Sequence, residues 1–177
     1  MPTSTPAGSV TTLEDVLEVL DAAAAQRLAV WVDGGWGVDA LLETQTRTHG
    51  DLDLAVQSSD ATAFEHALRT LGYERCHEPS ATPWNYLMAH PRGAVVDLHL
   101  IDLDDAGNGV LGPPQSRASY PADALRGTGR IGGIPVRCIS PDHAVAFHDA
   151  YVGDADDRAD VRAVCARFAL AIPEQYR

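Results

Sequence analysis

The chain has 177 residues, 45% of them hydrophobic and 21% charged, so we expect one packed domain and not a disordered chain. The formal net charge is −12, and such a surface repels the phosphates of DNA and RNA, which disfavours nucleic-acid binding. No segment approaches the roughly 20 apolar residues of a membrane span, and no export signal is expected at the N-terminus.

The charged and sulfur-containing residues narrow the class of protein further. The acidic surface would attract cations, either metal ions or an amine-bearing small molecule, although it can equally be a solubility feature. All 13 basic residues are arginine, so any bound anion must be held by arginine, backbone N–H groups or metal. Cys76, Cys138 and Cys165 have no CxxC spacing, which argues against disulfides and structural zinc. We therefore expect three core cysteines in a cytoplasmic protein.

The first third of the chain predicts a helix, a strand and a second helix. Residues 1–8 are small and polar, and we expect them to be frayed. The run from Thr11 to Glu14 has the spacing of a capping box and predicts a helix to about residue 26. Residues 28–32 predict a buried strand that ends at Asp33-Gly34-Gly35, with a helix from Trp36 to Leu42.

The remaining elements follow from strand-like alternation and from helix-like spacing of apolar residues. In chain order they are a strand at 51–57, a helix from a Ser59 cap to residue 71, strands at 73–77, 85–90 and 94–102, mostly loop at 103–133, a strand at 136–139, and helices at about 141–151 and 156–169. Because some neighbouring strands are joined by short turns, we expect a mixed sheet in an α+β or α/β unit.

Asp51 and Asp53 are the first indication of chemistry. They lie two residues apart on one strand, so both side chains leave the same face, with Cα atoms about 6.7 Å apart. Two carboxylates this close raise each other's pKa unless a cation lies between them. Hard oxygen ligands in that number suit Mg²⁺. A cap or turn at the start of the strand is the alternative for this pair taken alone.

Asp97 is a sharper anomaly, because it lies in the middle of an apolar strand, where aspartate is rarely found without a partner. If its strand lies beside the strand of Asp51 and Asp53, three carboxylates converge. Such a trio can hold two metal ions about 3.5–4 Å apart, the geometry that supports in-line attack at phosphorus.

Gly34 and Gly35 fall between a strand end and a helix start, where backbone N–H groups and the helix dipole bind phosphate. Without side chains, the two residues would let a nucleotide approach the backbone closely. A tight turn without a ligand is the alternative.

The strings GGWGVDALL, TRTHGDLDLAV and VVDLHLID occur in this order and together resemble the small antibiotic nucleotidyltransferases of the DNA polymerase beta superfamily. The lincosamide and aminoglycoside 2''-adenylyltransferases are the most similar type, and the resemblance covers nearly the whole chain. It implies an α+β (α/β-like) fold with a polymerase-beta-type nucleotidyltransferase core, in which helices flank a mixed, mostly antiparallel sheet. Residues 9–139 would form this core, and helices in residues 140–177 would pack on it as effectively one compact domain.

The resemblance also implies roles for five residues. Gly34 and Gly35 would cradle the nucleotide triphosphate, and Asp51 and Asp53 would bind Mg²⁺. Asp97 would be either a further metal ligand or the general base on the acceptor hydroxyl.

Five other residues are considered as supporting groups. Arg47 is either a phosphate contact of the nucleotide or a solvated surface arginine. His49 orients the Asp51 corner, touches the substrate or has no role. His99 either orients Asp97 or is a satisfied core histidine, and the core role is preferred. Trp36 is expected to pack beneath the phosphate corner as scaffold. Arg158 stands where the family carries lysine.

The function implied by the resemblance is Mg²⁺-dependent transfer of a nucleoside monophosphate, AMP from ATP, to a hydroxyl of a lincosamide or an aminoglycoside, releasing pyrophosphate. Two Mg²⁺ ions are expected, and a homodimer with acceptor sites at its interface is one option. The alternatives are a nucleotidyltransferase of this fold acting on a protein or tRNA, and a nucleotide-binding module without turnover. The net charge of −12 counts against tRNA, and three intact aspartates count against loss of turnover.

Overall fold

The computed structural model describes residues 8–113 and 119–177, so seven of the eight residues expected to be frayed lie outside it. The helices in these ranges are α1 (Leu13–Ala25), α2 (Gly34–Leu42), α3 (Ala61–Thr70), α4 (Pro141–His148) and α5 (Ala155–Phe168). The strands are β1 (Val30–Val32), β2 (Leu52–Gln57), β3 (Glu74–Arg75), β4 (Asn85–Ala89), β5 (Val95–Leu103), β6 (Gly109–Leu111), β7 (Ser119–Tyr120), β8 (Gly127–Ile131) and β9 (Ile134–Cys138). Among the described helices, none is both long and apolar enough to cross a membrane.

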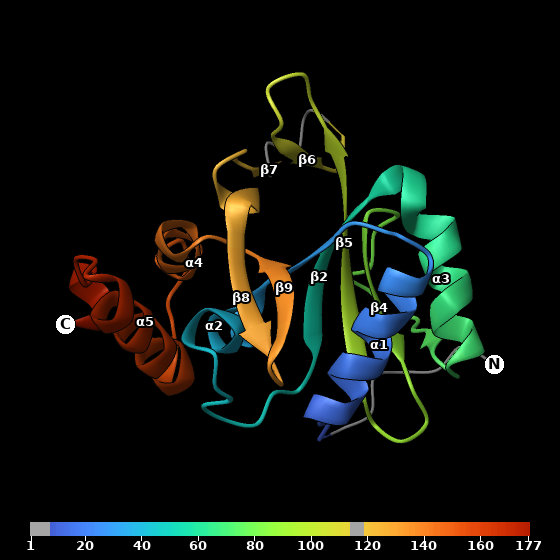
Figure 1. Cartoon of the computed structure of the whole chain (residues 1–177), viewed down its shortest axis with the longest axis horizontal. Coiled ribbons are helices and arrows are strands. Elements are labelled where there is room, and N and C mark those ends of the chain that lie inside the picture. The colour runs from blue at the N-terminus through green and yellow to red at the C-terminus, as the bar shows by residue number, and fades with distance from the viewer. Residues whose placement is uncertain (1–7, 114–118) are drawn as a thin grey trace.

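One sheet runs through the molecule in the order β3-β4-β5-β2-β1-β9-β8, and β6 pairs with both β5 and β7 beside this path. The pairs β2–β5 and β1–β9 are parallel, and the other pairs between the described strands are antiparallel. Helices α1 and α3 lie side by side, whereas α2, α4 and α5 form a second group (Figure 1). This arrangement confirms the α+β class with a mixed, mostly antiparallel sheet.

The centre of the sheet is the part that positions polar residues. Strand β2 is buried on both faces, since Leu52, Leu54 and Ala55 are fully covered. Its parallel neighbour β5 is aligned so that Asp53 pairs with Asp97. The strand of Asp97 therefore lies beside the strand of Asp53, the placement on which the functional hypothesis depends.

Three helix starts differ in detail from the predictions. The capping box of α1 is formed by Thr12 and Asp15, one residue later than predicted. Helix α2 begins at Gly34, because the side chain of Asp33 caps it by accepting the Gly34 N–H. Ser59 does not cap α3, because a 3₁₀ turn at Ser58–Asp60 precedes that helix.

The prediction of mostly loop at residues 103–133 was wrong for its described part, which contains β6, β7 and β8; residues 114–118 lie outside the described residues. The glycines that suggested a loop have another function here. A Cβ at Gly129 would overlap the backbone of Ala40 in α2, and a Cβ at Gly127 would overlap Cys138 and Ile139. Glycine therefore allows α2 to pack directly on an edge strand.

The three cysteines are free and buried, which confirms their prediction as core residues.

Candidate active site

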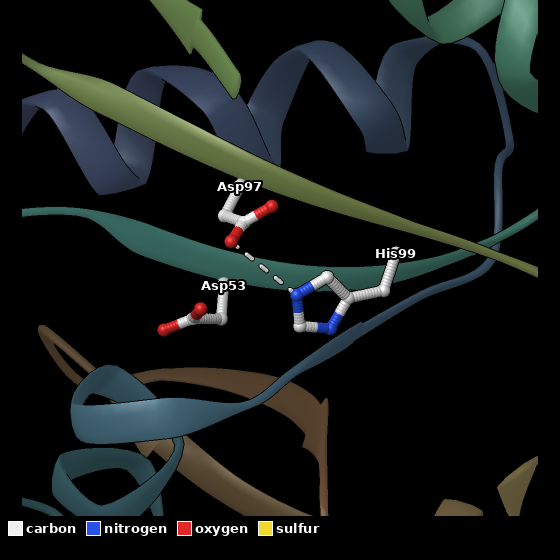
Figure 2. Close-up of side chains that lie close together, drawn as sticks. All are labelled: Asp53, Asp97 and His99. Carbon is white, nitrogen blue, oxygen red and sulfur yellow. Dashed lines mark ion pairs between the residues drawn. The ribbon is translucent and has the colours of Figure 1, made fainter. Parts of the chain in front are cut away.

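Asp53, Asp97 and His99 converge on one point between β2 and β5. One ligand atom from each residue lies within 4.8 Å of those of the other two. Figure 2 shows the three side chains reaching into the same space, with His99 Nε2 at 3.5 Å from Asp97 Oδ2. His99 therefore faces Asp97, as the orienting role requires, whereas the role preferred from sequence was that of a satisfied core histidine.

The electrostatics of this cluster are set by burial and by neighbouring carboxylates. Burial, together with the charge of Asp51, raises the pKa of Asp53 to about 8. Asp51 is exposed, but partial desolvation at the cleft and the charge of Asp97 also raise its pKa. Burial alone would lower the pKa of His99, but its hydrogen bond to Asp97 and the nearby carboxylates outweigh this and raise it to about 9. A cationic imidazole thus offsets part of the carboxylate charge, and a divalent cation fits the donor set.

Asp51 immediately precedes β2, which begins at Leu52, and it lies beside this cluster without belonging to it. It contributes to a cleft of about 240 Å³ next to Asp97. The cleft is lined by Asp51, Glu78, Ser80, Ala81, Asn85, Tyr86, Leu87 and Asp97. Three carboxylates in so small a hollow make it suited to a cationic group. A larger hollow of about 290 Å³, between α1 and β9, is lined by none of the three site aspartates.

The predicted phosphate corner lies against the acidic cluster. Gly34 has a φ of +56°, which glycine adopts without strain, and a Cβ there would overlap the carboxylate of Asp53. The N–H of Gly34 donates to Asp33 Oδ1 at 2.8 Å. The start of α2 is thus packed directly on Asp53, and Gly34 is needed for that close approach whether or not a nucleotide binds.

Gly35 packs against a buried histidine–aspartate pair. His49 Nε2 lies 2.5 Å from Asp39 Oδ2, and both residues are only 2% exposed. A Cβ at Gly35 would overlap the ring of His49. Trp36 is 1% exposed and lies with its ring centroid 4.8 Å from that of His49. His49 and Trp36 therefore form a scaffold beneath the corner, and Trp36 has no surface left for a ligand.

Arg47 connects the loop before β2 to helix α5. Its Nε and Nη2 donate to Asp160 Oδ2 at 3.2 and 2.8 Å, and Asp160 is 3% exposed. This pairing is a third role that the sequence analysis did not consider, and phosphate binding by Arg47 stays a prediction. Arg158 instead donates to the carbonyl oxygen of Arg177 at 3.5 Å.

Three further residues complete the cluster and were not predicted. Asn85 Nδ2 donates to Asp97 Oδ1 at 2.6 Å. The hydroxyl of Tyr120 lies 2.6 Å from His99 Nδ1 and donates to Asp33 Oδ2 at 2.9 Å. The position of Asp33 directly before the two glycines was a usable signal. Tyr120 gave none, because it lies in the stretch interpreted as loop.

Solved structures share this fold. The lincosamide antibiotic adenylyltransferase LnuA, solved with lincomycin bound, matches with a TM-score of 0.77 and 24% identity over 89% of this chain and 99% of that one. The ANT(2'')-Ia complex with adenylyl-2''-tobramycin matches with a TM-score of 0.67 and 23% identity, over 87% of each chain. These two neighbours show that the chain has the fold of the antibiotic adenylyltransferases.

The family follows from the sequence comparisons. The model of the aminoglycoside-2''-adenylyltransferase family matches residues 15–164, and the chain belongs to this family. It is 25% identical to a lincosamide resistance protein of Staphylococcus haemolyticus over 151 residues, covering 85% of this chain and 92% of the relative. It is 29% identical to a 2''-aminoglycoside nucleotidyltransferase of Klebsiella pneumoniae over 128 residues, covering 70% of this chain and only 64% of the relative. The resemblance predicted from three short strings is thereby confirmed.

Proposed function

We propose that this enzyme transfers a nucleoside monophosphate, AMP from ATP, to a hydroxyl of a lincosamide or an aminoglycoside, in a Mg²⁺-dependent reaction that releases pyrophosphate in the cytoplasm. The observation that carries the proposal is the convergence of Asp53 and Asp97 beside the start of α2. A carboxylate pair against a helix N-terminus can receive the metal and the phosphates of one nucleotide at a single point.

The donor set at this point fits a divalent metal ion. Asp53 and Asp97 offer hard oxygen atoms, and Asp51 adds a third carboxylate at the edge of the cleft. The raised pKa of Asp53 reflects its burial first and the charge of Asp51 second, and a cation bound beside it would offset both. When bound, Mg²⁺ supplies neutralisation of the phosphate charge and lowers the pKa of a hydroxyl near it.

The residues of the chain then divide the work as follows. The backbone of Gly34 and Gly35 receives the triphosphate at the start of α2. Asp97, held by the amide of Asn85 on one carboxylate oxygen, orients the acceptor hydroxyl or removes its proton. The buried pair of His49 and Asp39 keeps the corner in place.

We propose that the acceptor binds in the acidic cleft beside Asp97. Its lining includes Asp51 and Glu78 next to the aspartate that would meet the hydroxyl. An amine on the acceptor would be attracted to these carboxylates, as the net charge of −12 favours in general. The relatives named for lincosamides and aminoglycosides make these two antibiotic classes the first acceptors to test.

Pyrophosphate release tests the proposal. The purified chain is incubated with ATP, Mg²⁺ and a panel of lincosamides and aminoglycosides, with mass spectrometry of the products. We expect release that requires both Mg²⁺ and one class of acceptor, and an acceptor that gains AMP. Asp97→Asn should abolish it, whereas His66→Asn, on the exposed side of α3, should not.

Other outcomes identify the alternatives directly. Transfer to protein or tRNA in place of the antibiotics would replace the proposed acceptor class. ATP binding without pyrophosphate release for any acceptor would indicate a binding module without turnover.

A further inference from the structure

We propose that His99 is a metal ligand through Nε2, alongside Asp53 and Asp97, and that Tyr120 and Asp33 hold its ring for this role. The inference rests on the proposed metal-dependent function and assigns the metal a nitrogen ligand in addition to carboxylates. Its starting point is geometric, since the three ligand atoms lie within 4.8 Å of one another and come from adjacent strands (Figure 2).

The hydrogen bonds of Tyr120 fix which nitrogen of His99 faces the cluster. The Tyr120 hydroxyl has a single hydrogen, and it donates this hydrogen to Asp33 Oδ2 at 2.9 Å. Its oxygen, 2.6 Å from His99 Nδ1, must therefore accept from an N–H on Nδ1. Nε2, at 3.5 Å from Asp97 Oδ2, is then the nitrogen that would bind a metal, with release of its proton to solvent.

Asp33 is itself firmly held, so this chain of hydrogen bonds has a rigid end. Its Oδ1 accepts the N–H of Gly34 at 2.8 Å as the cap of α2. The ring of Tyr120 is 6% exposed and packs edge-on against Phe147, with 5.6 Å between centroids. The imidazole is thus oriented from the start of α2 and from α4 at once.

This arrangement has the form of a supported metal ligand. Histidines that bind metals generally donate their second ring N–H to an oxygen that orients the ring, and changing that outer partner costs about 10–100-fold in metal affinity. Tyr120 is on this view a positioning residue, because it acts on the metal through His99.

The test uses Mn²⁺ alone as the probe, with the full chain and without nucleotide or acceptor. Pulsed electron paramagnetic resonance detects a nitrogen bound directly to Mn²⁺. We expect ¹⁴N modulation in the unaltered protein that changes to the ¹⁵N pattern when histidine is ¹⁵N-labelled. The signal should disappear in His99→Asn and persist in His66→Asn, the matched control. Absence of nitrogen modulation in the unaltered protein would overturn the inference, and this measurement needs no variant to fold.

Mn²⁺ titrations followed by the signal of the free ion give the second readout. The dissociation constant should rise about 10–100-fold in Tyr120→Phe and at least as much in His99→Asn. Equal affinity in His99→Asn and the unaltered protein would overturn the inference. If Asp53→Asn alone loses Mn²⁺, the metal site of the proposed function stands and the role of His99 fails. If Asp53→Asn and His99→Asn both bind Mn²⁺ as tightly as the unaltered protein, the metal site of the proposed function and the role of His99 both fail.

Discussion

Asp53 on β2 and Asp97 on β5 are direct partners across two parallel strands, so their carboxylates leave the sheet side by side beneath the start of α2. Each is flanked along its strand by fully buried leucine or valine. The protein therefore maintains two adjacent acidic groups in a region where burial makes their charge costly. That relationship leads to the first two predictions.

Asp53→Asn should abolish nucleotidyl transfer without destabilising the metal-free protein. Loss of a carboxylate that binds the metal removes several kcal/mol of transition-state stabilisation, on the order of 10³-fold in rate. Because the pKa of Asp53 rises from 3.8 to about 8 on folding, its contribution to stability falls as the pH rises through that window. Asp53→Asn does not lose stability in this way. In urea unfolding with a chelator at pH 7.5, the variant should therefore be at least as stable as the unaltered protein. A clear loss of stability in Asp53→Asn under these conditions would contradict the inference that the ionised carboxylate of Asp53 destabilises the metal-free protein.

His99 should stabilise the metal-free protein in its protonated form. Its pKa is raised from 6.5 to about 9, so the stabilisation is complete below pH 6.5 and is lost as the pH rises through about 9. Comparison of the unaltered protein with His99→Gln measures the effect of the imidazole charge, including its influence on Asp53, whose pKa the charged His99 lowers. The difference in free energy of unfolding, measured with a chelator, should shrink by on the order of 2 kcal/mol from pH 6 to pH 9.5. If the difference in free energy of unfolding between the two proteins does not change with pH, the inference that His99 is charged in the folded protein is refuted.

Gly34→Ala should weaken Mn²⁺ binding as well as stability. Its φ of +56° is unfavourable for alanine, at about 1–2 kcal/mol, and the added Cβ must also displace Asp53. Gly133→Ala is the matched control, since Gly133 has a φ of +81° but nothing within 4 Å of its Cβ position. Unfolding and Mn²⁺ titration of both variants separate backbone strain from displacement of the carboxylate. Equal effects of the two substitutions would show that the contact with Asp53 is unimportant.

Arg47→Ala should act on stability more than on the nucleotide. Asp160 would be left buried without its partner, which we expect to cost about 2–3 kcal/mol, below the range for fully buried pairs because Arg47 is 27% exposed. Asp160→Asn keeps Arg47 and should cost less. Denaturation and the KM for ATP, measured on both, test the assignment. A rise in KM confined to Arg47→Ala would instead support the predicted phosphate contact.

The fold class, and Asp53 and Asp97 as members of the cluster, could be predicted because they depend on the pattern of neighbouring residues in the sequence. Alternation of apolar residues identified β2 and β5, and aspartate inside such strands is unfavourable enough to be conspicuous. The residues from 103 to 133 could not be predicted in this way. Glycine in this stretch allows α2 to pack closely on β8. A strand that carries glycine for close packing is as rich in glycine as a loop, so composition alone does not distinguish the two.

Outside residues 103–133, the sequence by itself determined where most strands and helices form, and it also identified the carboxylates whose charge is unfavourable without a partner, since both follow from residues close together in the chain. Only the tertiary structure decided that Asp53 lies beside Asp97, that Tyr120 reaches His99 and that Arg47 pairs with Asp160. Along the sequence, the two residues of these pairs lie 44, 21 and 113 positions apart, in that order. Contacts of that kind depend on strand order and helix packing, which no local spacing of residues encodes.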